Sequence, residues 1–75
     1  MNKLFFGQVV INNRNSERFG TRQNFIISSP NEENARKELE SWRDRYDEVT
    51  SLAEIKDAVD TDETSIGSTY IKFID

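Results

Sequence analysis

The chain has 75 residues, no cysteine, no histidine and a formal net charge of −4 at pH 7. This length predicts a single domain over residues 1–75, stabilised by one small hydrophobic core because no disulfide can form. Without histidine or cysteine, acid–base and nucleophilic chemistry would be left to carboxylates, lysine, tyrosine, serine and threonine, so the commonest catalytic side chains are excluded.

Two apolar segments near the N-terminus predict an antiparallel hairpin. Residues 4–11 are rich in Phe, Val and Ile and are followed by a polar cluster at residues 12–16, which is typical of a strand and a turn. Residues 19–27 then alternate, with Phe25 and Ile27 on the same face of a second strand. The connection is long enough to project from the sheet as a polar tip.

A helix is predicted after the second strand. Ser29 can cap its first turn, Glu32 can reach back to the Ser29 N–H, and Pro30 suits the first helical position. The helix is expected to run to about residue 46. Its apolar stripe consists of Ala35, Leu39, Trp42 and Tyr46. The stripe places Trp42 in the core rather than in a binding surface.

The C-terminal third contains one ambiguous segment and one clear strand. Residues 49–59 fit a short helical stripe that includes Leu52 and Ile55, or a strand that mirrors the first hairpin. Two-hairpin symmetry favours the strand, although Ala, Glu, Lys and Asp have poor strand propensity. Residues 68–75 alternate with apolar side chains on both faces, so we expect a central strand rather than an edge strand.

Together these elements predict an α+β fold. The expected order is strand, strand, helix, strand, strand (ββαββ), with one amphipathic helix packed across one face of a small antiparallel sheet. The other face of the sheet is expected to be partly open to solvent. An exposed sheet edge could also pair with a second copy, so both a monomer and a homodimer fit the sequence.

Sequence motifs of enzymes are missing. No segment matches a Gly-x-Ser-x-Gly nucleophile elbow, a phosphate-binding loop or a dinucleotide-binding fingerprint. A chain of this size is also expected to have little room for a substrate pocket of a few hundred cubic ångströms. The sequence therefore predicts a protein that is not an enzyme and that binds no cofactor.

The apolar run at residues 4–11 also bears on location. It is interrupted by Gln8 and is far shorter than the roughly 20 residues that a membrane span requires. A single lysine precedes it and no small-residue cleavage site follows, so no signal peptide is predicted. We expect a cytoplasmic protein without membrane partners.

Charge is unevenly distributed, and the N-terminal part is basic. Residues 1–28 carry four basic residues and one acidic residue. The first hairpin holds Arg14, Arg18 and Arg22, whose guanidinium groups suit phosphates and polar protein surfaces. Three interpretations fit this tip: a solvated loop, a protein-binding surface, or a nucleic-acid contact. The net charge opposes independent binding to nucleic acid, because the rest of the molecule repels its backbone.

The C-terminal part is acidic. Residues 44–75 carry nine acidic and three basic residues. An alternative binding patch is formed by Asp57, Asp60, Asp62 and Glu63. A solvated loop, a partner-facing patch and a weak cation site all fit these residues. The spacing of Asp60 and Asp62 matches the start of a calcium loop, but the glycine and the glutamate that complete such a loop are absent, so no metal site is predicted.

Two short motifs resemble a known family. Asn15-Ser16-Glu17-Arg18-Phe19-Gly20-Thr21 at the first turn, and Ala35-Arg36-Lys37 on the helix, are similar to motifs of a small phage-encoded type I-F anti-CRISPR family. The similarity covers roughly residues 1–40. It implies that Arg36 and Lys37 contact the backbone subunits of a CRISPR surveillance complex and obstruct guide pairing with target DNA.

This chain also departs from the family. It is acidic, and Glu33, Glu38 and Glu40 surround the basic pair on the helix. Arg36 and Lys37 can also simply pair with Glu32 and Glu33, four residues earlier. A different target, or an acidic surface that imitates DNA, therefore stays open.

The resulting prediction is a non-enzymatic inhibitor of phage type. It would bind a host protein or ribonucleoprotein complex, with Cas proteins as the partners that the resemblance implies, and block recognition of target nucleic acid. The expected contact residues are Arg14, Arg18, Arg22, Arg36 and Lys37. The alternatives are an acidic DNA mimic of antirestriction type and a small nucleic-acid-binding module that uses the basic hairpin.

Overall fold

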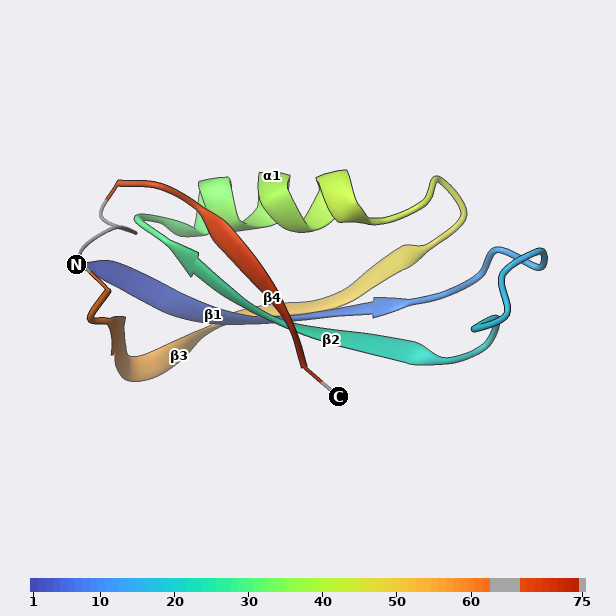
Figure 1. The fold of residues 1–75 in the computed structure, drawn as a ribbon, viewed down its shortest axis with the longest axis horizontal. Coiled ribbons are helices and arrows are strands. Elements are labelled where there is room, and N and C mark those ends of the chain that lie inside the picture. The colour runs from blue at the N-terminus through green and yellow to red at the C-terminus, as the bar shows by residue number, and fades with distance from the viewer. Residues whose placement is uncertain (63–66, 75) are drawn as a thin grey trace.

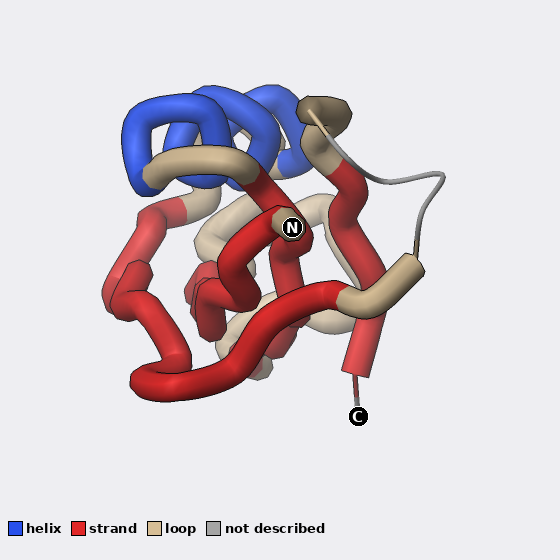
Figure 2. The backbone as a smooth tube through the Cα atoms, turned by 90° about the vertical axis from the view of Figure 1, so that its left-hand side faces the viewer, coloured by secondary structure: helices blue, strands red, loops and turns tan. Residues whose placement is uncertain are grey.

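The computed structural model describes residues 1–62 and 67–74, and the sheet in this part is built from four strands (Figure 1). The elements follow in the order β1 (Asn2–Val10), β2 (Arg22–Ser29), α1 (Glu32–Trp42), β3 (Glu48–Asp60) and β4 (Tyr70–Ile74). The strands are antiparallel and lie in the order β3-β1-β2-β4. Figure 2 shows α1 lying across one face of the sheet. The predicted α+β fold with ββαββ order is confirmed.

The predicted hairpin is formed by β1 and β2. Phe5 lies opposite Ile27 and Gly7 lies opposite Phe25, so the apolar residues of both strands share the face beneath α1. The strands are joined by a tip at residues 11–21. Gly20 closes this tip in the left-handed region, at a φ of 84°, where a side chain would be strained.

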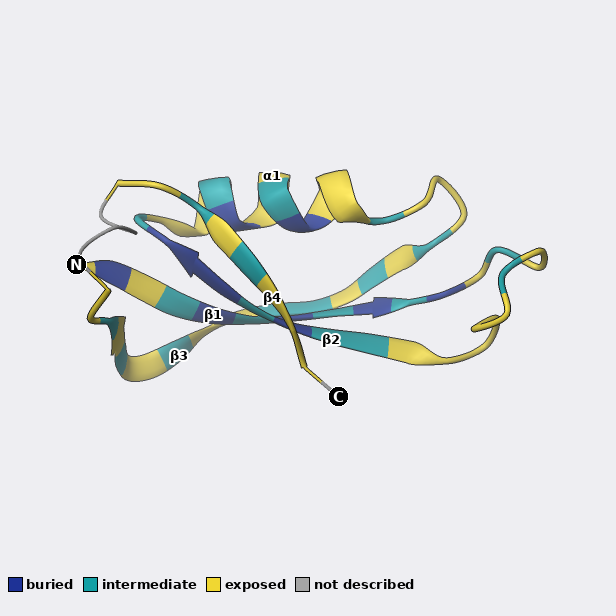
Figure 3. Ribbon diagram, viewed as in Figure 1, coloured by how far each residue is buried: buried dark blue, intermediate teal, exposed yellow. Residues whose placement is uncertain are grey.

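The core lies between α1 and the central strands. It is formed by Phe5, Val9, Phe25, Ile27, Ala35 and Leu39. In Figure 3 the buried residues lie on β1, on β2 and on the side of α1 that faces them. Leu39 approaches the sheet over Gly7, where an added Cβ would be only 2.9 Å from Leu39 Cδ2. The absence of a side chain at residue 7 thus lets the helix pack closely on β1.

The start of α1 differs from the prediction. Asn31 is the N-cap, and its Oδ1 accepts a hydrogen bond from the Asn34 N–H at 2.8 Å. The predicted cap at Ser29 is wrong, because Ser29 is the last residue of β2, where it is buried and its Oγ donates to the Asn31 carbonyl at 2.8 Å. Pro30 accordingly precedes the cap instead of opening the helix.

The end of α1 also differs. Arg43 has an extended conformation, with φ −85° and ψ 147°, so the helix stops at Trp42. The prediction that Trp42 and Tyr46 belong to the core is wrong, since they are 56% and 52% exposed. Tyr46 lies in the turn after the helix and therefore leaves the stripe, while the Trp42 Nε1 donates to Glu38 Oε1 at 3.2 Å on the helix surface.

The cap of α1 provides a first testable prediction. Asn31→Ala is expected to lower the free energy of unfolding by about 1 kcal/mol, because the Asn34 N–H loses its acceptor. Urea unfolding followed by circular dichroism measures the change. Asn12→Ala is the control, since exposed Asn12 contributes its backbone N–H rather than its side chain to the described hydrogen bonds. Equal stabilities of the two variants would contradict this role of Asn31.

The last two strands settle two open points. Residues 49–59 belong to β3, so the strand alternative is right; its ladder with β1 shifts register twice, and Asp57 has a φ of 62°. The expectation that the last strand is central is wrong, because β4 forms an edge beside β2. The apolar residues on the two faces of β4 have different surroundings. Phe73 packs on Phe25 beneath α1, with ring centroids 5.0 Å apart, and Ile74 lies on the opposite face.

The described part of the chain contains no helix that is both long enough and apolar enough to cross a membrane.

Candidate partner-binding surface

The hairpin tip projects beyond the end of the sheet (Figure 1). Its own hydrogen bonds shape it: the Asn15 N–H donates to Asn13 Oδ1 at 3.0 Å, and the Thr21 hydroxyl donates to the Arg18 carbonyl at 2.6 Å. At its base the Ile11 N–H donates to the Thr21 carbonyl at 2.9 Å. These bonds satisfy the polar groups of the turn locally and leave the long side chains free to face outward.

The connection between α1 and β3, at residues 43–47, is attached to this tip. Asp47 Oδ1 accepts from the Asn12 N–H at 3.0 Å, and Asp44 Oδ2 accepts from Asn13 Nδ2 at 2.8 Å. Arg43 Nη1 donates to the Asp47 carbonyl at 3.0 Å. Two loops that are more than 30 residues apart in the chain are thus fixed to each other, and both aspartates are engaged inside the joint.

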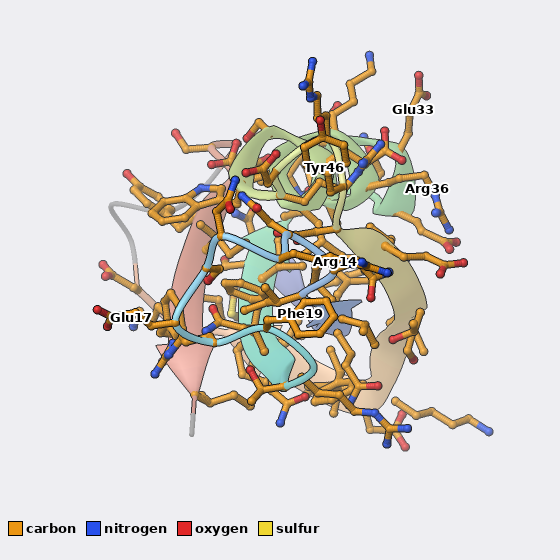
Figure 4. The ribbon with its side chains drawn as sticks, turned by 90° about the vertical axis from the view of Figure 1, so that its right-hand side faces the viewer. Arg14, Glu17, Phe19, Glu33, Arg36 and Tyr46 are labelled. Carbon is orange, nitrogen blue, oxygen red and sulfur yellow. The ribbon has the colours of Figure 1, made fainter. Side chains whose placement is uncertain are left out.

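This joint brings together arginine and aromatic side chains at one end of the molecule. We call them the tip surface, and they are Arg14, Phe19, Arg45 and Tyr46. Figure 4 views the molecule from this end and shows Arg14 and Phe19 on the hairpin with Tyr46 above them. The Arg45 guanidinium lies 4.6 Å from the centroid of the Tyr46 ring and donates to the Tyr46 hydroxyl. Phe19 is 51% exposed.

The arginines of the tip surface form no ion pair within the described residues. Within residues 1–62 and 67–74, the ion pairs are Lys3–Glu54, Arg36–Glu32 and Lys37–Glu33. Neither Arg14 nor Arg45 takes part in any of them. Asp44 and Asp47 accept hydrogen bonds within the joint but keep their negative charge, so the tip surface presents its cations and aromatic rings beside two carboxylates.

The other predicted basic residues lie elsewhere. Arg36 and Lys37 project from the middle of α1 and pair with Glu32 and Glu33 at 4.0 Å and 3.5 Å, which is worth only a few tenths of a kcal/mol for exposed groups. In Figure 4 Arg36 lies at the side of the helix, away from the hairpin tip. The fold therefore does not join the helix pair and the hairpin arginines into one continuous surface.

Arg18 and Arg22 lie at the base of the tip, next to β4. The Arg18 guanidinium lies 5.8 Å from the centroid of the Phe73 ring. Arg22 is the first residue of β2, opposite Val10, on the sheet face that α1 does not cover. These two arginines are therefore directed toward the end of β4 rather than toward Tyr46.

The acidic alternative has a different character. Asp60 Oδ2 accepts from the Ser28 hydroxyl at 2.6 Å, and its Oδ1 accepts from the Asp62 N–H at 3.0 Å. This half-buried carboxylate holds the end of β3 against β2. Asp57 is exposed on β3, and Glu63 lies outside the described residues. No three acidic side chains in the described part gather closely enough to hold a metal ion.

The expectation of little room for a pocket is wrong. A cavity of about 380 Å³ lies on the open face of the sheet, over Leu4 and Ile26 and beside Tyr70 and Asp60. It forms because the end of β3 passes over this face, where Asp60 is bonded to Ser28. A second cavity, of about 240 Å³, lies between the hairpin tip and the end of β4.

Sequence reasoning found Arg14 but missed Arg45 and Tyr46. Tyr46 was placed on the buried stripe of a longer helix, and Arg45 stood among mixed charges without any pattern of its own. The useful signal was the polar run from Arg43 to Glu48, which has the composition of a loop and not of a further helical turn.

Comparisons of the chain with known protein families, with curated proteins and with solved structures found no match. The assignment of function therefore rests on the residues and on their arrangement.

Proposed function

We propose that this protein is a non-enzymatic binding protein that attaches to a protein or ribonucleoprotein complex through the tip surface and inhibits it. The observation that carries this proposal is the gathering of Arg14, Arg45, Phe19 and Tyr46 on two loops that are hydrogen-bonded to each other. The target suggested by the sequence resemblance is a type I-F CRISPR surveillance complex, in which the protein would block recognition of target nucleic acid.

The composition of the tip surface supports a role in binding protein. Arginine, tyrosine and tryptophan dominate the residues that contribute most to protein–protein affinity. The bonds from Asn12 and Asn13 to the 43–47 connection hold the two loops together before any partner arrives. Less conformational entropy is then lost on association, which raises affinity without new contacts.

Arg36 and Lys37 remain part of the proposal as a second contact. Their pairs with Glu32 and Glu33 are exposed, so a partner carboxylate could replace either glutamate at little cost. The tip surface is nevertheless the stronger candidate, since its arginines form no ion pair within the described residues that a partner would have to break.

One alternative function is favoured by a specific feature. Phe19 is exposed on the same tip as Arg14, and a ring beside guanidinium groups can stack on an unpaired base. The net charge of −4 opposes this alternative. Titration of the protein with a labelled single-stranded oligonucleotide over a salt series tests it. If the protein bound the oligonucleotide with micromolar affinity, and if this affinity fell steeply with salt concentration, we would assign nucleic-acid binding to the tip in place of protein binding.

The main test compares charge-reversed variants in binding to a purified type I-F surveillance complex, measured by biolayer interferometry. Arg14→Glu with Arg45→Glu is expected to weaken binding at least about a hundredfold, because two central residues of an interface each contribute on the order of 2 kcal/mol. Lys56→Glu with Lys72→Glu introduces the same change in charge away from the tip and is expected to bind as the wild type does.

Two outcomes would contradict the proposal. If Arg36→Glu with Lys37→Glu abolished binding while the tip variant bound normally, the helix would be the site. If the wild-type protein did not bind the complex, the proposed target would be wrong.

A further inference from the structure

The cavity of about 380 Å³ on the open face of the sheet exists because β3 bends near its end. From Glu54 to Val59, β3 advances by five residues while its partner β1 advances by only two. Asp57 lies inside this bulge and has a φ of 62°. A bulge bends its strand, and here the bend brings Asp60 to Ser28 on the open face. In Figure 1 the end of β3 accordingly dips below β1, on the side away from α1.

The floor of the cavity is apolar, and the wall opposite the end of β3 is β4. Leu4 and Ile26 lie on the open face, because alternation along each strand places their neighbours Phe5 and Ile27 in the core beneath α1. Both floor residues are half-buried and both line the cavity. Lys72 lies opposite Ile26 on β4 and therefore projects from the same face of the sheet.

The two walls carry charges of opposite sign. Lys72 lines the cavity on β4, and no ion pair in the described part of the chain involves it. Asp60 and Asp62 line the cavity on the side of β3. The carboxylate of Asp60 is oriented by the Ser28 hydroxyl, which donates to it at 2.6 Å, and by the Asp62 N–H, which donates to it at 3.0 Å.

We infer that this cavity binds a free amino acid with an apolar side chain. The carboxylate of the ligand would pair with Lys72, and its ammonium group would lie toward Asp60 and Asp62. Its side chain would cover Leu4 and Ile26. The volume is near the lower end of the range of about 300–1,000 Å³ for small-ligand sites, which suits a molecule of this size better than a nucleotide cofactor.

A zwitterion fits the cavity better than a ligand with a single charge. A fatty acid would be attracted by Lys72 but repelled by the two aspartates, and an alkylamine would meet the opposite difficulty. An amino acid carries both charges next to each other and leaves its apolar side chain for the floor.

The inference goes beyond the proposed function. The cavity is bounded by the end of β3 and the start of β1, which lie at the end of the molecule opposite the hairpin tip (Figure 1). Ligand binding there can be measured on the isolated protein, so its outcome is independent of whether the tip surface binds a partner.

The test is a titration of the whole chain followed by ¹⁵N-edited NMR. The probe is leucine, and three controls each remove one feature of it: 4-methylpentanoate lacks the ammonium group, leucinamide lacks the carboxylate, and alanine lacks most of the apolar side chain. Leucine is expected to shift the amide signals of Ile26 and Lys72 in a saturable way. Each control is expected to bind at least tenfold more weakly.

A variant assigns the carboxylate contact. Lys72→Gln is expected to weaken leucine binding at least tenfold without weakening the binding of leucinamide, whereas damage to the cavity itself would weaken both. Lys56→Gln is the matched control, since Lys56 is exposed on β3 and does not line the cavity. It is expected to change leucine binding less than twofold.

Four results would overturn the inference. Equal affinity for 4-methylpentanoate would leave only a carboxylate site, and equal affinity for leucinamide would indicate a site for the amino terminus of a peptide. Equal affinity for alanine would show that the apolar floor makes no contribution. The absence of saturable shifts at millimolar leucine would exclude the site altogether.

Discussion

Replacing Leu39 by alanine is expected to lower the free energy of unfolding by about 2–5 kcal/mol, the range for deleting a fully buried leucine side chain. Leu39 is 0% exposed and connects α1 to the sheet above Gly7. A domain of this length has a total stability of only about 4–11 kcal/mol. The single change is therefore expected to remove a large share of the stability, because the short helix has few other anchors in the core.

Urea unfolding monitored by circular dichroism measures this loss. Glu40→Ala is the control, since Glu40 is the next residue of α1 and is exposed. We expect the control to change stability by less than about 0.5 kcal/mol. A loss below about 1 kcal/mol for Leu39→Ala would mean that α1 is not anchored through this residue.

Replacing Gly7 by valine is expected to destabilise the protein by about 1–3 kcal/mol through overpacking. The first added carbon would already lie 2.9 Å from Leu39 Cδ2 and 3.0 Å from Ile27 Cδ1. Valine favours strands over glycine by up to about 1 kcal/mol, which offsets part of this cost. The cost of the clash is expected to exceed this gain, because both neighbours are fully buried.

The double variant separates the two effects. In the Leu39→Ala background one of the two side chains that collide with residue 7 is gone and the contact with Ile27 remains, so Gly7→Val is expected to cost clearly less than it does in the wild type. The coupling between the two changes should reach at least about 1 kcal/mol in a double-mutant cycle of unfolding free energies. Additive effects would show that the strain at residue 7 arises from another neighbour.

The fold was largely predictable because short-range patterns determine most of it. Alternation in the first hairpin and the apolar spacing of Ala35 and Leu39 placed β1, β2 and α1 on the correct faces. The position of β4 was not predictable in this way. A strand with apolar residues on both faces is typical of a central position, but here the second face lies against the cavity that the end of β3 creates.

The errors around α1 have a common cause. Both Ser29 and Asn31 can cap a helix, and the choice depends on how far β2 extends, which is set by pairing with β1 up to Lys3–Ser29. At the other end, the stripe through Trp42 and Tyr46 continues in the sequence after the backbone has left the helix. The 43–47 connection is hydrogen-bonded to Asn12 and Asn13. This is a tertiary contact, about which the spacing of apolar residues along the helix carries no information.

The candidate site was predictable only in part, for the same reason. Arg14 stood out as part of a basic hairpin, whereas Arg45 and Tyr46 join it only through hydrogen bonds between distant loops. Nothing in the local sequence distinguishes Asp44 and Asp47, which organise this joint, from solvated acidic residues.

The central place of β1 has a consequence for how the protein is made. Its neighbours are β2, which follows after the tip at residues 11–21, and β3, which begins at Glu48. During synthesis the first hairpin can close early, but β1 keeps one unpaired edge until the chain through Asp60 has left the ribosome. Such a nascent chain exposes a free strand edge, which is a ready template for pairing with another chain until β3 covers it.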